Sequence, residues 1–287
     1  MAGNDREISF DAIASILFEE HDRPASMSIK AFYKIVYFID QGLIEKGYTT
    51  DVEHFWYKYG TMTVTAGSGV TVESTGESSE VLCSVTPEEL ELDSAMETEI
   101  RTVTQEVLAD YDRLNTEGLT DRMYEEAPYE FQRQYRELDG LIQGEIRCRG
   151  SESQEFDRES IRAQMHEFIS AFPEEKFARF TNDLFLWYDI LSTVLDDRTI
   201  SLREIAEITE IFWTIVMLEL ATNPETGVES DTLENELNID DAAGLQAYLR
   251  HRLSQLEREH LSVEIGTTSF KEVADLVMVS QLDFVES

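Results

Sequence analysis

The stretch from Ile29 to Gly60 constrains the fold of this chain more than any other. Its first part repeats apolar residues three and four positions apart, which places them along one face of a helix. Ser28 is suited to cap the start of that helix, and Gly47 is suited to end it, because glycine adopts the left-handed conformation without a Cβ penalty. The predicted apolar face consists of Ile29, Phe32, Val36, Ile39 and Leu43. The opposite side is expected to carry Lys30, Lys34, Gln41 and Glu45.

The second part of the stretch, residues 54–59, reads His-Phe-Trp-Tyr-Lys-Tyr and is too aromatic and too short for another helix. It predicts a β-strand whose successive side chains face opposite ways. Residues 61–84 continue with β-forming valines and threonines that three glycines interrupt. We therefore expect a small antiparallel sheet of two or three strands after the helix.

This helix and this strand carry a recognisable motif. The helix contains the pattern K-x-x-Y-F-x-D, and the aromatic strand closes on Tyr-Gly. The combination resembles the Panacea domain, an antitoxin module that is associated with phages and toxins and also occurs in SocA-like proteins. The matching residues are Lys34, Tyr37, Phe38, Asp40, Phe55, Trp56, Tyr59 and Gly60.

The resemblance covers roughly residues 10–145, because the segments 85–90 and 119–128 are also similar to that family. The chain departs from the family at Thr61, where the family usually carries proline, and in a Gly/Ser/Thr-rich insertion at residues 65–80. The motif is a packing pattern rather than a catalytic signature. It implies a module that neutralises a toxin or couples to a regulatory protein.

The charge of the chain is extreme and evenly spread. The formal net charge is −36, with 13 basic and 30 acidic residues in the first 150 positions and 10 and 29 in the remainder. Only 6 of the 23 basic residues are lysine. This composition is typical of a protein adapted to multimolar salt, where repulsion between carboxylates is screened within about 3 Å at 1 M. The alternative, a mimic of nucleic acid, would concentrate its acidic residues on one face.

No residue pattern in the chain predicts catalysis, a metal site or a cofactor. The five histidines do not follow a metal-ligand spacing, and Cys83 and Cys148 lie far apart. Gly67-Ser68-Gly69 lacks the lysine of a phosphate-binding loop and predicts a hairpin turn. No apolar run approaches 18 residues, so we expect a soluble cytoplasmic protein without a membrane partner. Nucleic-acid binding stays open, because no basic run longer than Arg147-Cys148-Arg149 supports it.

Periodicity predicts helices along most of the remaining chain. Residues 199–217 favour one plain helix over a helix-turn-helix, since no turn residue interrupts their pattern. The polar segment 149–155 is the best candidate for a linker. The predicted helices span residues 9–20, 87–114, 129–146, 156–171, 174–195, a segment starting at Ser201, 240–260 and 269–284. Ser9 and Ser201 are suited to cap two of these helices, and Thr86 with Glu89 predicts a capping box at the start of the helix 87–114. The expected fold is mainly α: an α+β domain with a small antiparallel sheet (1–148), the linker, and an all-α helical bundle (156–287).

The aromatic residues around the strand are the candidate partner-binding site. They outnumber what one contact between a helix and a small sheet can bury, and Tyr and Trp are enriched in binding hot spots. The candidate residues are Tyr37, Asp40, Trp56, Tyr57, Lys58 and Tyr59. The leading hypothesis is a non-enzymatic interaction module whose partner is a toxin, a regulatory protein or a second copy of the chain. The alternatives are a DNA-binding regulator that uses the aromatic hairpin as a wing, and an enzyme.

Overall fold

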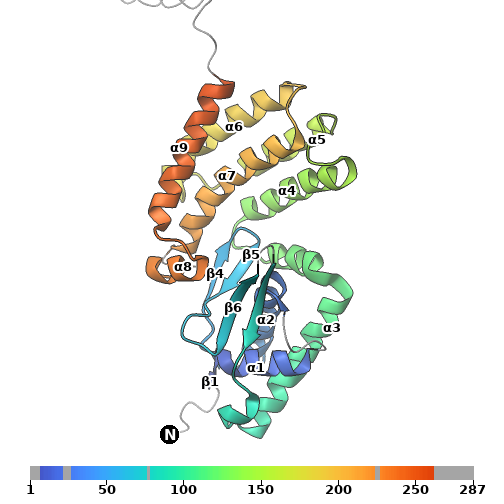
Figure 1. The fold of residues 1–287 in the computed structure, drawn as a ribbon, viewed down its shortest axis with the longest axis vertical. Helices are drawn as coiled ribbons and strands as arrows, with labels where there is room; N and C mark the ends of the chain where they lie inside the picture. Colours follow the sequence, from blue (N-terminus) through green and yellow to red (C-terminus); the bar gives the residue numbers. More distant parts are fainter. Residues whose placement is uncertain (1–6, 22–26, 76–77, 224–226, 262–287) are drawn as a thin grey trace, which may run out of the picture.

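The computed structural model describes residues 7–21, 27–75, 78–223 and 227–261. The described chain forms a small α+β half that carries a helical bundle at one end, and a β-hairpin lies between the two (Figure 1). The predicted fold class, mainly α with a small antiparallel β part followed by a helical bundle, is confirmed.

The two helices of the N-terminal half begin where their capping residues predict. Helix α1 (Phe10–Glu20) is capped by the hydroxyl of Ser9, and α2 (Ile29–Glu45) by that of Ser28. Gly47 follows α2 in the left-handed region, with a φ angle of 87°. Local chemistry therefore sets the ends of both helices.

The strands of the described residues form three small sheets instead of a single one. The short strands β1 (Glu7–Ile8) and β3 (Thr49–Thr50) pair in parallel. The hairpin strands β4 (His54–Tyr57) and β5 (Gly60–Thr63) pair only with each other. The third sheet is antiparallel and consists of β2 (Met27–Ser28), β7 (Ser78–Cys83) and β6 (Val70–Thr75), in that order.

The helix predicted to start at Thr86 starts later. Thr86 and Glu89 do form the expected capping box, but they cap a short 3₁₀ helix, η1 (Pro87–Leu90), that ends at Glu91 with a φ angle of 48°. Helix α3 (Ser94–Glu125) begins after a new cap at Asp93. It is interrupted at Asn115, which has φ 58° and ψ −174°. The predicted end near residue 114 therefore coincides with a break inside α3.

The bundle is built around one long buried helix. Its described helices are α4 (Glu130–Arg149), α5 (Arg158–Ser170), α6 (Thr181–Asp196), α7 (Leu202–Ala221), α8 (Ser230–Leu237) and α9 (Ala242–His260). Helix α7 contacts α4, α6 and α9 and also strand β4. It runs uninterrupted, as the plain-helix prediction required, and Ser201 caps it. Helix α8 was not predicted, and the predicted helix 269–284 lies outside the described residues.

Aromatic packing connects α4 with the rest of the bundle. The rings of Tyr135 in α4 and Trp213 in α7 stack with centroids 3.7 Å apart. Phe131 contacts Phe168 in α5 with centroids 6.1 Å apart. The core therefore continues across the predicted linker 149–155, and the division of the chain into two domains stays a prediction.

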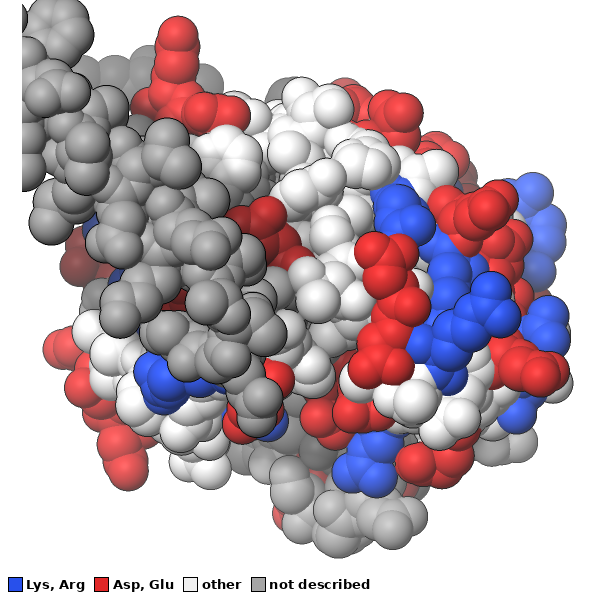
Figure 2. Space-filling model, turned by 90° about the horizontal axis from the view of Figure 1, so that it is seen from above, with Lys and Arg blue, Asp and Glu red and all other residues white. Residues whose placement is uncertain are grey.

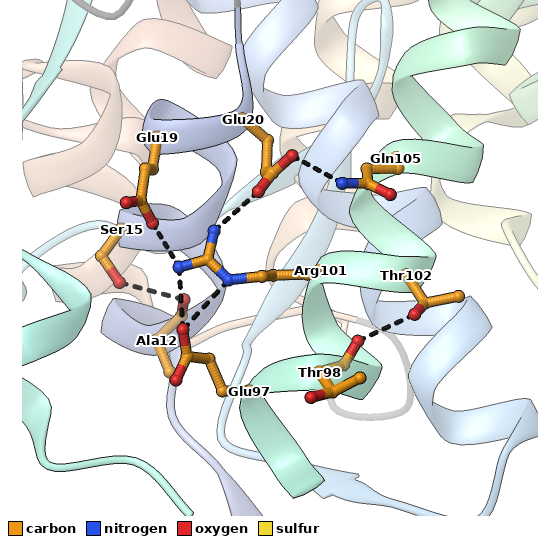
Figure 3. A network of polar contacts seen from close by, with 9 residues as sticks. All are labelled: Ala12, Ser15, Glu19, Glu20, Glu97, Thr98, Arg101, Thr102 and Gln105. Atoms are coloured by element: carbon orange, nitrogen blue, oxygen red, sulfur yellow. Dashed lines mark hydrogen bonds and ion pairs between the residues drawn. The ribbon is translucent and has the colours of Figure 1, made fainter. Parts of the chain in front are cut away.

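Arg101 holds α3 against α1 in an otherwise acidic surface. Its guanidinium pairs with Glu97 of its own helix and with Glu19 and Glu20 at the end of α1 (Figure 3). Gln105 donates a further hydrogen bond of 2.8 Å to Glu20. The three ion pairs favour the charged guanidinium and raise the pKa of Arg101 against the opposing effect of partial burial. Planar arginine suits this place because it offers several donors in fixed directions.

Candidate partner-binding pocket

The aromatic hairpin β4–β5 is buried on both faces. Trp56 points toward the N-terminal half and contacts the ring of Tyr124 in α3, with centroids 5.5 Å apart. Phe55 points the other way, into a separate core cluster. The buried members of that cluster are Phe55, Leu218, Ala221, Leu233 and Ala242. The face of the hairpin that carries Phe55 is therefore covered by the second half of the chain.

The turn of this hairpin is held by side chains from three distant helices. The carbonyl of Lys58 accepts hydrogen bonds from the hydroxyl of Tyr124 at 2.7 Å and from the indole N–H of Trp213 at 3.0 Å. The carbonyl of Tyr59 accepts one from the ammonium of Lys34 at 3.0 Å. Helices α2, α3 and α7 thus fix two adjacent peptide groups, which gives the turn a defined shape.

Gly60, the glycine of the Tyr-Gly motif, sits where no other residue fits well. Its φ angle is 112°, and a Cβ atom there would lie 2.5 Å from the sulfur of Met123. A side chain would therefore meet both backbone strain and a steric clash. The motif requires glycine for packing.

A cavity of about 200 Å³ opens beside this turn. Its walls are mostly apolar and come from the start of α2, the hairpin and the last residue of α8. The lining residues are Ile29, Lys30, Tyr33, Lys34, Tyr57, Lys58, Tyr59, Gly60, Thr61, Met62 and Leu237. We call this cavity the lysine–tyrosine pocket. It contains three of the six lysines of the chain, although the net charge of the chain is −36.

The tyrosines of the pocket are neutral over a wide pH range. Burial raises the pKa of Tyr57 to about 12, helped by the nearby carboxylate of Glu210. Burial also raises the pKa of Tyr33 and Tyr59. Tyr59 is still 46% exposed, and the ammonium of Lys30 lies 4.2 Å from its ring centroid. The mouth of the pocket is therefore lined by an aromatic ring with a cation beside it. A protein partner can pack an aromatic or apolar side chain against such a ring.

Lys34 is the exceptional residue of the pocket. The sequence predicts it on the side of α2 opposite the apolar face, and the hairpin turn covers it there and leaves it only 3% exposed. Burial, together with the positive charges of Lys30 and Arg136, lowers its pKa to about 8. Buried charges are normally paired, so a lysine in this state marks a candidate functional site.

The pKa of Lys34 predicts how stability depends on pH. Its folded pKa of about 8 lies below the unfolded value of 10.5, so the unfolded chain binds more protons between these values. The contribution of Lys34 to stability should therefore rise with pH in that window. We expect urea unfolding at fixed KCl to show that the free energy of unfolding of the wild type, relative to that of Lys34→Met, rises by about 1–2 kcal/mol between pH 8 and about 9.5. This comparison cancels the opposing effect of Cys83, whose pKa is raised by burial. Parallel pH profiles of the two proteins would contradict this assignment.

The six predicted site residues separate into two groups. Tyr57, Lys58 and Tyr59 line the pocket. Trp56 lies on the opposite face of its strand and is 8% exposed, so it is a core residue. Asp40 is buried as well, and Tyr37 lies outside the pocket.

The two motif residues Tyr37 and Asp40 have structural partners. The carboxylate of Asp40 accepts a hydrogen bond from the hydroxyl of Thr50 and contacts the ring nitrogen of His54 at 3.1 Å. The hydroxyl of Tyr37 donates to Glu126 at 3.3 Å. Asp40 thus fastens β3 and β4 to α2, and Tyr37 links α2 to the end of α3.

Sequence reasoning missed five lining residues with a clear role in the pocket: Lys30, Tyr33, Lys34, Met62 and Leu237. The spacing of lysines in the sequence indicates two of these residues, Lys30 and Lys34. In a chain that prefers arginine, Lys30 and Lys34 lie one helical turn apart and near the only lysine of the aromatic run, Lys58. No comparable signal exists for Leu237, which reaches the pocket through the unpredicted helix α8.

An arginine-lined cavity at the bundle end is less suited to bind a partner. Arg149, Arg158 and Arg198 line a hollow of about 730 Å³. The guanidinium of Arg158 donates to the carbonyl of Leu195 at 3.2 Å and to three other carbonyls, so it caps α6 and fixes the loops. Viewed from the bundle end, basic side chains gather on one side and are interleaved with acidic ones (Figure 2).

Within the described ranges, no group of three or more metal-ligating side chains comes together, and no helix is long and apolar enough to cross a membrane. No family model, no curated protein and no solved structure matches the chain.

Proposed function

We propose that this protein is a non-enzymatic interaction module, antitoxin-like or adaptor-like, from a halophile, and that its protein partner docks at the lysine–tyrosine pocket. The observation that carries the proposal is the concentration of three lysines and three tyrosines around one small apolar cavity in a strongly acidic chain. Tyrosine and a cation beside an apolar cavity form the kind of anchor that dominates protein interfaces.

The motif residues support the proposal because they shape this site. Lys34 donates a hydrogen bond to the carbonyl of Tyr59, and Asp40 fastens the strand that leads into the turn. Gly60, the next residue after Tyr59, adopts the positive φ angle of the turn. The resemblance to the Panacea domain rests on these same residues. A family that neutralises proteins would thus use its motif to hold an aromatic turn in a fixed shape for binding.

High salt makes a pocket of this kind effective. At 1 M salt, charges separated by more than about 3 Å are screened, so long-range attraction contributes little. Buried contacts between aromatic and apolar groups keep their strength, since salts strengthen rather than weaken burial in many cases. A partner in such a medium is better recognised by a fitted cavity than by a charged surface.

Capture of the partner tests the proposal. Tagged protein should retain a stoichiometric protein from a lysate of its own host kept at multimolar KCl. Tyr59→Ala should reduce this capture at least tenfold, because the exposed ring forms the mouth of the pocket, and should change the melting temperature little. Tyr248→Ala is the matched control, since this tyrosine is 63% exposed on α9 and does not line the pocket.

Two outcomes would count against the proposal. Equal capture by wild type and Tyr59→Ala would place the partner elsewhere or show that the captured protein binds nonspecifically. Enrichment of DNA without a protein would favour the alternative of a DNA-binding regulator. In that case the element that contacts DNA could not be the β4–β5 hairpin acting as a wing, because both faces of this hairpin are covered.

A further inference from the structure

The ammonium of Lys34 lacks a counter-charge in the described part of the chain. Its one hydrogen bond goes to the carbonyl of Tyr59 at 3.0 Å, which satisfies one of its three donors. Among the described residues no carboxylate forms an ion pair with it, and the charges that act on it most are those of Lys30 and Arg136. A buried charge without a partner is costly, so a site that retains one is prepared for an anion.

The two other lysines of the pocket are already engaged. Lys58 forms an ion pair of 2.6 Å with Glu210, and Lys30 lies over the ring of Tyr59 at 4.2 Å. An incoming anion would therefore find its open position at Lys34. The surrounding walls, which include Tyr33, Met62 and Leu237, offer the group that carries this anion a largely apolar contact.

The size of the pocket limits the ligand. Its volume of about 200 Å³ is below the roughly 300–1,000 Å³ of typical sites for drug-sized ligands and cofactors. One or two side chains of a protein fill such a space. A group that combines a carboxylate with a neighbouring apolar side chain satisfies both the ammonium and the walls.

We propose that the lysine–tyrosine pocket recognises a carboxylate of the protein partner, carried next to an apolar side chain, and that Lys34 pairs with this carboxylate. The inference rests on the proposed function and adds the chemistry of the partner's anchor. A carboxylate that reaches Lys34 is shielded from salt by the pocket walls, so the ion pair keeps its strength in a medium that screens exposed pairs.

Two blocked dipeptides test this chemistry without knowledge of the partner. Acetyl-Leu-Asp-amide and acetyl-Leu-Asn-amide differ in one side-chain group, a charged carboxylate in the first and an uncharged carboxamide of similar shape in the second. In titrations of the full chain at fixed multimolar KCl, followed by the NMR signal of the lysine Cε groups, the Asp peptide should bind about tenfold or more tightly than the Asn peptide. This factor corresponds to one charge-assisted hydrogen bond. The Asp peptide should also shift the NMR signal of Lys34.

Three variants identify the group that is responsible for the preference for the Asp peptide over the Asn peptide. Lys34→Met removes the charge, and Lys34→Gln removes the charge but keeps a donor for the carbonyl of Tyr59. Both should lose the preference for the Asp peptide, and thermal melting shows that they are folded. Lys46→Met, at the far end of α2 and paired with Glu99, should keep the preference.

Several results would overturn the inference. These are equal binding of the two peptides to wild type, a preference for Asp that survives in both Lys34 variants, and a Lys34 signal that inorganic phosphate shifts while the peptides do not. Self-association that both Lys34 variants abolish would assign the site to a second copy of the chain.

Failure of this inference can be told apart from failure of the proposed function. Partner capture that depends on Tyr59 but persists in Lys34→Met would support the proposed function and contradict the inference that a carboxylate is the partner's anchor. A preference for the Asp peptide without any capture that depends on Tyr59 would support a carboxylate-binding site and contradict the proposed docking of a protein partner there.

Discussion

Gly60→Ala is expected to lower the free energy of unfolding by about 2–4 kcal/mol. Alanine at a φ angle of 112° costs about 1 kcal/mol relative to glycine, because its Cβ crowds the backbone. The same Cβ would lie 2.5 Å from the sulfur of Met123, and overpacking of this kind costs about 1–3 kcal/mol. Met123 cannot withdraw freely, since its sulfur also accepts the N–H of Thr61 at 3.0 Å.

Gly67→Ala is the matched control for this prediction. Gly67 also has a positive φ angle, of 83°, but a Cβ there meets nothing within 4 Å. It should therefore show only the backbone cost of about 1 kcal/mol. Urea unfolding of both variants at one KCl concentration measures the difference. Equal losses would mean that the hairpin turn yields easily and is not held in a fixed shape.

Trp56→Ala is expected to cost about 3–5 kcal/mol of stability, the range for removing a buried large aromatic side chain. Trp56 is 8% exposed and packs edge-on against Tyr124, whose hydroxyl in turn holds the hairpin turn. The melting temperature should fall steeply. Loss of binding in this variant would then follow from unfolding rather than from the loss of a contact.

Tyr59→Ala provides the comparison for Trp56→Ala. The two residues lie three positions apart, but Tyr59 is 46% exposed, and Lys34 holds it through its backbone carbonyl, which the substitution keeps. Its truncation should change stability by no more than about 0.5–1 kcal/mol. If Trp56→Ala melted like wild type and only lost its partner, Trp56 would belong to the binding surface and the burial described above would be contradicted.

Much of the local structure could be predicted because it depends on nearby residues. Ser9, Ser28 and Ser201 cap their helices as expected, and Gly47 ends α2. These features need only a few neighbouring residues to form. The start of α3 was mispredicted for the same local reason: Thr86 caps a helix, but Glu91 ends it after a single turn.

The site could be predicted only in part because it depends on distant contacts. Lys34 is buried by a turn 25 residues away, and Trp213 bonds to Lys58 across 155 residues. A periodicity argument therefore assigned Lys34 to the polar side of α2. The second face of the hairpin is covered by residues from α7, α8 and α9, which no pattern within the hairpin reveals.

The composition of the chain carries information about the site. Scarcity of lysine is typical of adaptation to salt, yet the few lysines of this chain are not evenly placed. Half of them line one pocket. A residue type that a composition disfavours is informative where it persists.

The most direct test of the central claim is a footprint of the partner on the protein. Amide hydrogen exchange of the full chain, free and with its captured partner in multimolar KCl, should show new protection at residues 57–62 and at the start of α2. These segments form the mouth of the lysine–tyrosine pocket. Protection that leaves residues 57–62 unchanged and appears instead around the arginine-lined cavity at residues 149–158 would contradict the account.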